Sequence, residues 1–132
     1  MSETMAARVV YIVETDRSVR EGLARVVDSA GLESMQCESL EELLRHAPAA
    51  HAACAVLDIS ALSARRGAVP SSLSAVAATI PIIALSARDD PATRRLAREL
   101  GAAAFFRKPV DAAALLDSIA WVTRAEAAPP AD

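Results

Sequence analysis

The stretch RVVYIVETD, residues 8–16, decides the fold class. Its first six residues are mainly β-branched and apolar, which is typical of a strand covered on both faces. Two acids with a threonine between them follow, Glu14, Thr15 and Asp16, and apolar residues then recur at helical spacing. Asp16 is expected to cap a helix that Gly31 ends. A buried strand that leads into a helix is the first unit of an α/β fold.

The same unit recurs along the chain. Further strands are predicted at residues 32–37, 52–58, 81–86 and 102–106. Helices are predicted after Asp16 and at about 39–46, 72–79, 90–100 and 111–124, while ISALSARRGAVP, residues 59–70, is expected to be a loop. Ser39 with Glu42 forms a capping box, and Asp90 precedes Pro91 as a second clear cap. Five strands that alternate with five helices predict one doubly wound parallel sheet with helices on both faces.

Length and charge restrict the function classes. A chain of 132 residues, 53% hydrophobic and 23% charged, is about the size of one globular domain. The domain is expected to span residues 1–125, and 126–132, rich in alanine and proline, to form a linker or disordered tail. The net charge of −3 argues against direct nucleic-acid binding, which needs concentrated Lys and Arg. Without a membrane-length apolar run or a signal peptide, a cytoplasmic location is expected.

The cysteines and histidines do not indicate a reactive site. Cys37 and Cys54 lie in predicted strands without metal-binding spacing, so we expect buried, reduced thiols. His46 and His51 flank Pro48 in a connection, where surface positions are expected. Neither pair has the neighbours that metal binding or catalysis would need.

The polar residues at the strand ends form the candidate site. They are Glu14, Thr15 and Asp16 after the first strand, Asp58 at the end of the third, Ser86 at the end of the fourth, and Lys108 with Pro109 after the fifth. In open parallel sheets ligands bind beyond the carboxyl ends of the strands, so these side chains are expected to converge. The set suits phosphoryl transfer to Asp58, with Ser86 and Lys108 binding phosphoryl oxygens and acids holding a divalent ion such as magnesium. The alternative is an ordinary polar pair of Asp58 and Lys108 at the sheet edge.

Four stretches together carry a family resemblance. They are YIVETDRSVREGL at 11–23, AVLD at 55–58, ALSA at 84–87 and LGAAAFFRKPVD at 100–111. In order and spacing the chain resembles, over residues 8–124, the receiver domains of bacterial two-component response regulators. The resemblance implies a flavodoxin-like five-stranded sheet of order 2-1-3-4-5 and a cis bond before Pro109. It also implies Asp58 as phosphoacceptor, Ser86 as switch hydroxyl, Lys108 as phosphate-binding lysine and Phe105 as switch aromatic.

The acidic pocket departs from the family pattern. The family ends its first strand with two acids, of which the second binds magnesium directly, whereas this chain has Glu14 and Thr15. A neutral hydroxyl is a weaker ligand than a carboxylate, so magnesium binding through Glu14 and Asp58 is expected to be weak or absent. Asp16 is an alternative ligand, but its helix-capping role is favoured. A Met-Pro pair usual in the loop after the acceptor is replaced by Ala61 and Leu62.

The resemblance implies a phosphorelay function. A histidine kinase would phosphorylate Asp58. The surface of the fourth helix, fifth strand and fifth helix would pass the signal to an output domain, such as one that binds DNA, or to a second copy of the chain. Arginines on that surface, Arg94, Arg95, Arg98 and Arg107, suit an acidic partner, although a charged helix face is commonly only solvated. Trp121 on the final helix is expected to be buried.

Two other functions remain as alternatives. The first is a pseudo-receiver, a module that binds proteins through the same surface without phosphorylation. The second is a small enzyme of similar fold, which is disfavoured because the four glycines are not clustered into a phosphate loop. A phosphatase with a second aspartate two residues after the nucleophile is disfavoured too, because Ser60 stands there. We therefore expect a signalling module and not an enzyme.

Overall fold

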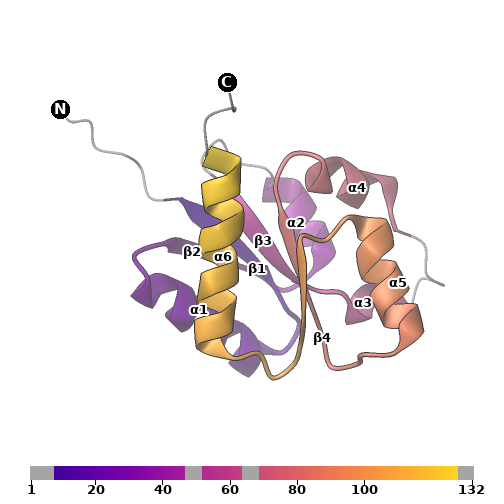
Figure 1. The fold of residues 1–132 in the computed structure, drawn as a ribbon, viewed down its shortest axis with the longest axis horizontal. Coiled ribbons are helices and arrows are strands. Elements are labelled where there is room, and N and C mark those ends of the chain that lie inside the picture. The colour runs from indigo at the N-terminus through magenta and orange to yellow at the C-terminus, as the bar shows by residue number, and fades with distance from the viewer. Residues whose placement is uncertain (1–7, 47–51, 64–68, 128–132) are drawn as a thin grey trace.

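The computed structural model describes residues 8–46, 52–63 and 69–127, and within them the chain forms one parallel sheet covered by helices (Figure 1). The strands are β1 (Val9–Val13), β2 (Glu33–Cys37), β3 (Ala52–Asp58), β4 (Ile82–Ser86) and β5 (Ala104–Arg107). They lie in the order β2-β1-β3-β4-β5, and every neighbouring pair is parallel. The predicted flavodoxin-like sheet and its strand order are confirmed.

Five helices connect and cover the strands, as predicted. They are α1 (Arg17–Ser29), α2 (Leu40–His46), α4 (Ser71–Ala77), α5 (Pro91–Leu100) and α6 (Ala112–Ala127). The fourth and fifth helices of the sequence analysis are thus α5 and α6. The last helix extends three residues beyond the expected end near Arg124. Pro48, His51 and residues 128–132 of the expected tail lie outside the described residues.

One more turn of helix, α3 (Ser60–Ser63), lies in the segment that was expected to be a loop. The loop prediction is therefore wrong for these four residues. Leu62 is 1% exposed, and its backbone N–H donates to the carbonyl of Ile59 at 3.0 Å. Burial of this one apolar side chain explains the turn, because four residues are too few for helix propensity to matter by itself.

The two faces of the sheet carry separate cores. On one face α1 and α6 contribute Leu23, Val27, Leu115 and Ile119, which pack on strand residues such as Ile12 and Val56. On the other face α2, α4 and α5 contribute Leu43, Leu73 and Leu96, which pack on Tyr11, Leu57 and Ala84. Figure 1 shows the same division, with α1 and α6 on one side of the strands and the other helices opposite. Alternating strand residues thus anchor both helix layers, and this leaves the strand ends free for a site.

Aspartate side chains cap the N-termini of α1 and α5, which begin a few residues after β1 and β4 end. The Asp16 carboxylate accepts a hydrogen bond from the Val19 N–H at 3.0 Å, and Asp90 accepts from the Thr93 N–H at 2.8 Å. Gly101, with φ of 82°, ends α5 in the left-handed conformation that glycine adopts without strain. Among the described residues, no helix is long and apolar enough to cross a membrane.

The capping box at α2 is only partly as predicted. Ser39 Oγ accepts from the Glu42 N–H at 3.2 Å, which is the expected half. The Glu42 carboxylate, however, accepts from the N–H of Glu38 at 2.8 Å. The reciprocal bond therefore reaches one residue further back than the motif prescribes.

The prediction that Trp121 is buried is wrong. Its side chain is 63% exposed, whereas Leu115, Ile119 and Val122 on the same helix are buried. These three residues form one stripe at helical spacing, and Trp121 points roughly 120° away from it because successive residues rotate by about 100°. The stripe covers the sheet without the indole, which leaves Trp121 on the outer surface of α6.

The buried thiols lead to a first prediction. Cys37 and Cys54 are free and fully buried, as expected, and burial raises the pKa of Cys37 to about 11 and that of Cys54 to about 12. Because only the thiolate is a nucleophile, roughly one Cys37 thiol in a thousand would be reactive at pH 8 even if iodoacetamide reached it. We expect both cysteines to be labelled far more slowly in the native protein than in urea, as mass spectrometry would measure. Labelling at equal rates would contradict their burial.

Candidate functional site

The carboxyl ends of four adjacent strands bring the predicted polar residues together. Glu14 follows β1, Asp58 ends β3, Ser86 ends β4 and Lys108 follows β5. The parallel register sets Asp58 opposite Leu85 and Ser86 opposite Arg107, so Asp58, Ser86 and Lys108 follow one another by one residue each at this edge. The N–H of Lys108 donates to the carbonyl of Ser86 at 2.8 Å, which ties the lysine to the end of β4. The peptide bond between Lys108 and Pro109 is cis.

Lys108 joins two carboxylates into one cluster. Its Nζ lies 2.7 Å from Glu14 Oε1 and 3.0 Å from Asp58 Oδ2. The other carboxylate oxygens accept backbone hydrogen bonds, Glu14 Oε2 from Asp16 at 3.0 Å and Asp58 Oδ1 from Ser60 at 2.9 Å. The arrangement is therefore not the simple pair of Asp58 and Lys108 considered from the sequence. We call Glu14, Asp58 and Lys108 the ion cluster.

The protonation of the ion cluster follows from its hydrogen bonds. Burial by itself would raise the pKa of Asp58, but hydrogen bonds from Ser60 and Lys108 together outweigh it, and the pKa lies below its usual value. Burial would lower the pKa of Lys108, but the carboxylates of Glu14 and Asp58 outweigh it and raise that pKa. At neutral pH Asp58 is consequently an anion and Lys108 a cation.

Thr15 and Asp16 lie outside the ion cluster. Both residues are exposed, and the Asp16 carboxylate caps α1 as favoured from the sequence. Among the described residues, no three Asp, Glu, His or Cys side chains are grouped closely enough to hold a metal ion. The Glu14 side chain is 2% exposed, and both of its oxygens already accept hydrogen bonds. In this arrangement the carboxylates of Glu14 and Asp58 do not form a site for a divalent cation, because the Lys108 ammonium lies between them.

Of the two predicted switch residues, Ser86 contacts Lys108 of the ion cluster, and Phe105 lies on the neighbouring strand β5. Ser86 is buried, and its Oγ accepts a hydrogen bond from the Arg88 N–H at 3.0 Å. Phe105 on β5 pairs with Ala84, two residues before Ser86 on the neighbouring strand. The guanidinium of Arg94 lies over the Phe105 ring, 5.5 Å from its centre, and forms an ion pair with Asp89. The aromatic ring is thus covered by a cation that the loop after β4 holds.

The four predicted surface arginines are all exposed. Two of them, Arg94 and Arg98, line a hollow of about 290 Å³ together with Phe105 and three alanines, Ala97, Ala102 and Ala104. Arg95 and Arg107 do not line it within the described part of the chain. Cations therefore gather around an apolar floor on the face of α5 and β5.

Arg20 is a buried residue beside the site that the sequence analysis missed. Its side chain is buried and donates to the carbonyl oxygens of Glu14 at 2.9 Å and Thr15 at 3.5 Å, and to Gln36 Oε1 at 3.2 Å. A signal was present, because Arg20 shares the inward stripe of α1 with Leu23 and Val27, at i+3 and i+7. A charged residue on an apolar stripe indicates a buried polar partner.

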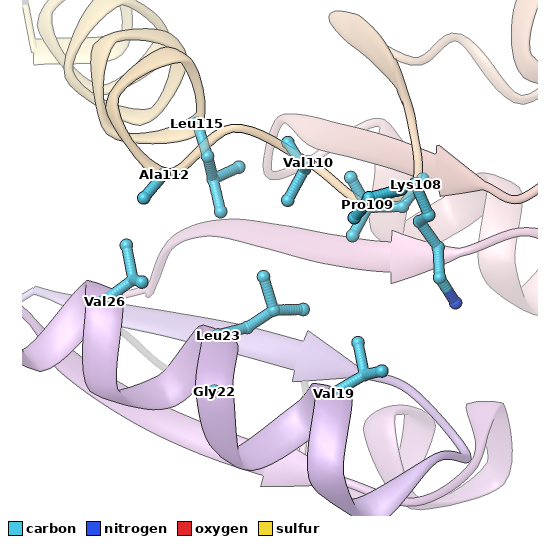
Figure 2. A pocket seen from close by; sticks show the side chains of 10 residues that line it. Val19, Gly22, Leu23, Val26, Lys108, Pro109, Val110, Ala112 and Leu115 are labelled. Carbon is cyan, nitrogen blue, oxygen red and sulfur yellow. The ribbon is translucent and has the colours of Figure 1, made fainter.

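An apolar pocket of about 410 Å³ adjoins the ion cluster between α1 and the start of α6 (Figure 2). Its lining residues are Val19, Gly22, Leu23, Val26, Leu85, Lys108, Pro109, Val110, Ala112 and Leu115. Figure 2 shows the Lys108 nitrogen directed away from the apolar side chains. The aliphatic stem of this lysine therefore forms one wall of the pocket, while its ammonium group belongs to the ion cluster.

Known proteins share this sequence pattern. The response regulator receiver domain family matches residues 10–120. Response regulator protein TodT of Pseudomonas putida is 32% identical over 114 residues, which cover 86% of this chain and 50% of that protein. Nodulation protein W of Bradyrhizobium diazoefficiens is 31% identical over 123 residues, 92% of this chain and 54% of that protein. The chain thus spans about half the length of these curated relatives.

Solved structures share the fold. A CheY-like response regulator receiver domain protein from Methanospirillum hungatei superposes with a TM-score of 0.76 at 17% identity, covering 92% of this chain and 97% of that one. Chemotaxis protein CheY4 of Vibrio cholerae gives 0.72 at 21% identity, with 89% and 99% covered. At these identities the likeness supports the fold alone, but the family match extends over most of the sequence. This chain therefore belongs to the response regulator receiver domain family, whose members are signalling modules of two-component systems and not enzymes.

Proposed function

We propose that the chain accepts a phosphoryl group on Asp58 from a histidine kinase. The observation that supports this most is the hydrogen bonding of Asp58, whose carboxylate lies at the end of β3 between the Ser60 N–H and the Lys108 ammonium. The lowered pKa of Asp58 keeps this carboxylate ionised and nucleophilic at neutral pH. One of its oxygens would attack the phosphorus of a phosphohistidine, so that an acyl phosphate forms as the P–N bond breaks and the imidazole leaves.

Lys108 and Ser86 would stabilise the product. Lys108 Nζ would leave Asp58 Oδ2 to bind a phosphoryl oxygen, while it keeps Glu14 as its second partner. Ser86 Oγ accepts a hydrogen bond from Arg88, and its own hydroxyl proton is available to donate to the phosphoryl group. We expect magnesium to bind weakly or not at all, because Thr15 supplies no carboxylate and Lys108 lies between Glu14 and Asp58.

The surface formed by α5, β5 and α6 would change on phosphorylation and bind the downstream partner. A shift of Ser86 toward a phosphoryl group would alter the loop that carries Asp89, and hence the ion pair with Arg94 above Phe105. The arginines Arg94, Arg95, Arg98 and Arg107 would favour an acidic partner or a second copy of the chain. We propose a receiver domain in a cytoplasmic location, with a linker that begins after Ala127 and not at the expected 126, because α6 continues to Ala127. We propose a DNA-binding output domain, because one relative is named transcriptional regulatory protein FixJ.

Acetyl phosphate tests the phosphoacceptor directly. We expect the wild type to gain the mass of one phosphoryl group, and beryllofluoride to shift the amide NMR signals of Ser86 and Lys108. Asp58→Asn is the matched control, since it keeps the size of the side chain and removes the nucleophile. No mass gain and no spectral change in the wild type, with or without magnesium, would refute phosphorylation of Asp58.

A phosphorylation-independent binding module is the second candidate. Thr15 in the acidic pocket and the saturated hydrogen bonds of the ion cluster favour it, because a phosphoryl group must displace Lys108 from Asp58. This function predicts that Asp58→Asn binds the partner as tightly as the wild type. Charge reversal at Arg94 and Arg98 should weaken binding in either function, so the result for Asp58→Asn is what separates this module from a phosphorylation switch.

A further inference from the structure

Arg20 is unusual among the basic residues of the described chain. Its side chain is 7% exposed, and its hydrogen-bond acceptors are the carbonyl oxygens of Glu14 and Thr15 and the amide oxygen of Gln36. All three acceptors are uncharged. Burial of a guanidinium removes its favourable interaction with water, and neutral oxygens offset this loss of free energy less than a carboxylate would. A buried cation that has no charged partner in the described part of the chain indicates that its hydrogen bonds hold neighbouring backbone groups in place.

The two carbonyls that the Arg20 guanidinium binds belong to the turn between β1 and α1. The Nη1 atom of Arg20 binds the carbonyl of Glu14 at 2.9 Å, and its Nε binds Gln36 on the neighbouring strand β2. The backbone N–H of Arg20 donates to the carbonyl of Asp16 at 2.9 Å as part of the first turn of α1. The guanidinium thus ties the turn to α1 and to β2 at the same time.

The same turn presents Glu14 to the ion cluster. While the carbonyl of Glu14 binds Arg20, its carboxylate accepts from the Asp16 N–H at 3.0 Å and from Lys108 Nζ at 2.7 Å. A rotation of this turn would therefore move the carboxylate away from Lys108. Because Lys108 also binds Asp58, the displacement would reach the acceptor carboxylate.

We propose that Arg20 is a positioning residue for the phosphoacceptor site. Arg20 holds the turn at residues 14–16 so that the Glu14 carboxylate orients Lys108 toward Asp58. The proposal deepens the proposed function, on which its catalytic consequence rests. Arg20 touches neither Asp58 nor Lys108 in the described contacts and acts through Glu14. Supporting residues of this kind commonly change rates by one or two orders of magnitude.

The test compares Arg20→Gln with Arg25→Gln. Both changes remove one positive charge from α1, but Arg25 is exposed. Two readouts are needed, hydrogen exchange of the Asp16 amide measured by NMR and the rate of Asp58 labelling by acetyl phosphate. We expect Arg20→Gln to speed the exchange about tenfold and to slow labelling at least tenfold, with Arg25→Gln close to wild type. Unchanged exchange and labelling in a folded Arg20→Gln protein, even one with a lower melting temperature, would overturn the proposal.

Two further variants separate geometry from charge and guard against unfolding. Arg20→Lys keeps the charge but replaces the two separate donor atoms, Nε toward Gln36 and Nη1 toward the turn, with a single nitrogen, so both effects should persist. Wild-type behaviour of Arg20→Lys would overturn positioning in favour of a pure charge effect. Gln36→Ala removes only the acceptor of Nε and should give a smaller change in the same direction. If the wild type takes no phosphate at all, the proposed function fails, while exchange of the Asp16 amide still decides whether Arg20 holds the turn.

Discussion

Replacing Lys108 with methionine is expected to lower the free energy of unfolding by roughly 3 kcal/mol at pH 7. The change keeps the aliphatic wall of the adjoining pocket but removes the cation between Glu14 and Asp58. Two poorly exposed carboxylates would then face each other with backbone N–H partners but no cation between them. Urea unfolding followed by circular dichroism would measure the loss. Arg107→Gln is the matched control, because it removes a charge from the preceding, exposed residue.

The pH dependence of this effect has a definite sign. The pKa of Asp58 is lowered in the folded state, so its stabilisation is present above the unfolded value near 4 and is lost as pH falls through the folded pKa. The pKa of Lys108 is raised, so its stabilisation is present below about 10.4 and is lost as pH rises through the folded pKa. The wild type should therefore be nearly constant in stability between these limits, as far as the ion cluster is concerned.

Lys108→Met should behave differently on the acid side. Without the ammonium, burial and repulsion from the Glu14 carboxylate raise the affinity of Asp58 for a proton, so stability should increase as pH falls from 7 to 5. A variant that loses less than about 0.5 kcal/mol, or that shows the wild-type pH profile, would mean that the ion cluster contributes little to folding.

Thr15→Asp is expected to raise magnesium affinity about ten- to a hundredfold. The substitution places a second carboxylate beside Glu14, so a magnesium ion competes better with Lys108 for the carboxylates. Thr15 is exposed, so the new side chain needs no repacking of the core. Isothermal titration calorimetry would measure the affinity, and a rise in acetyl phosphate labelling with magnesium should accompany the gain.

Thr15→Asn is the control for this change, because it matches aspartate in shape but lacks its charge. We expect it to bind magnesium as weakly as the wild type. Equal, tight binding by the wild type and Thr15→Asp would show that Glu14 and Asp58 suffice as ligands. The placement of Lys108 between these two carboxylates would then have to change when the ion binds.

The location of the site could be predicted because topology determines it. Asp58 and Ser86 end strands that are buried on both faces, and Lys108 follows β5 directly. A parallel sheet brings such ends to one edge whatever the side chains are. Asp16 was predictable as a cap for a similar reason, since a local hydrogen bond to the Val19 N–H needs no tertiary information.

The contacts inside the site could not be derived in the same way. Lys108 reaches Glu14, 94 residues away, through a flexible side chain whose torsions depend on all of its neighbours. The role of Arg20 needs the position of Gln36 on another strand. Trp121 was misplaced because three aliphatic residues of α6 already cover the sheet, and helical spacing alone does not reveal which apolar residue is superfluous.

The chain contains thirteen arginines but a single lysine, the one in the ion cluster. Feeding lysine enriched only at its side-chain nitrogen during expression would therefore produce one side-chain nitrogen resonance, which comes from Lys108. Reductive methylation would likewise modify one side-chain amine besides the terminal amine. The chemical shift of the single lysine side chain would therefore report when a phosphoryl group or a metal ion binds near Asp58, and when the turn after β1 moves Glu14.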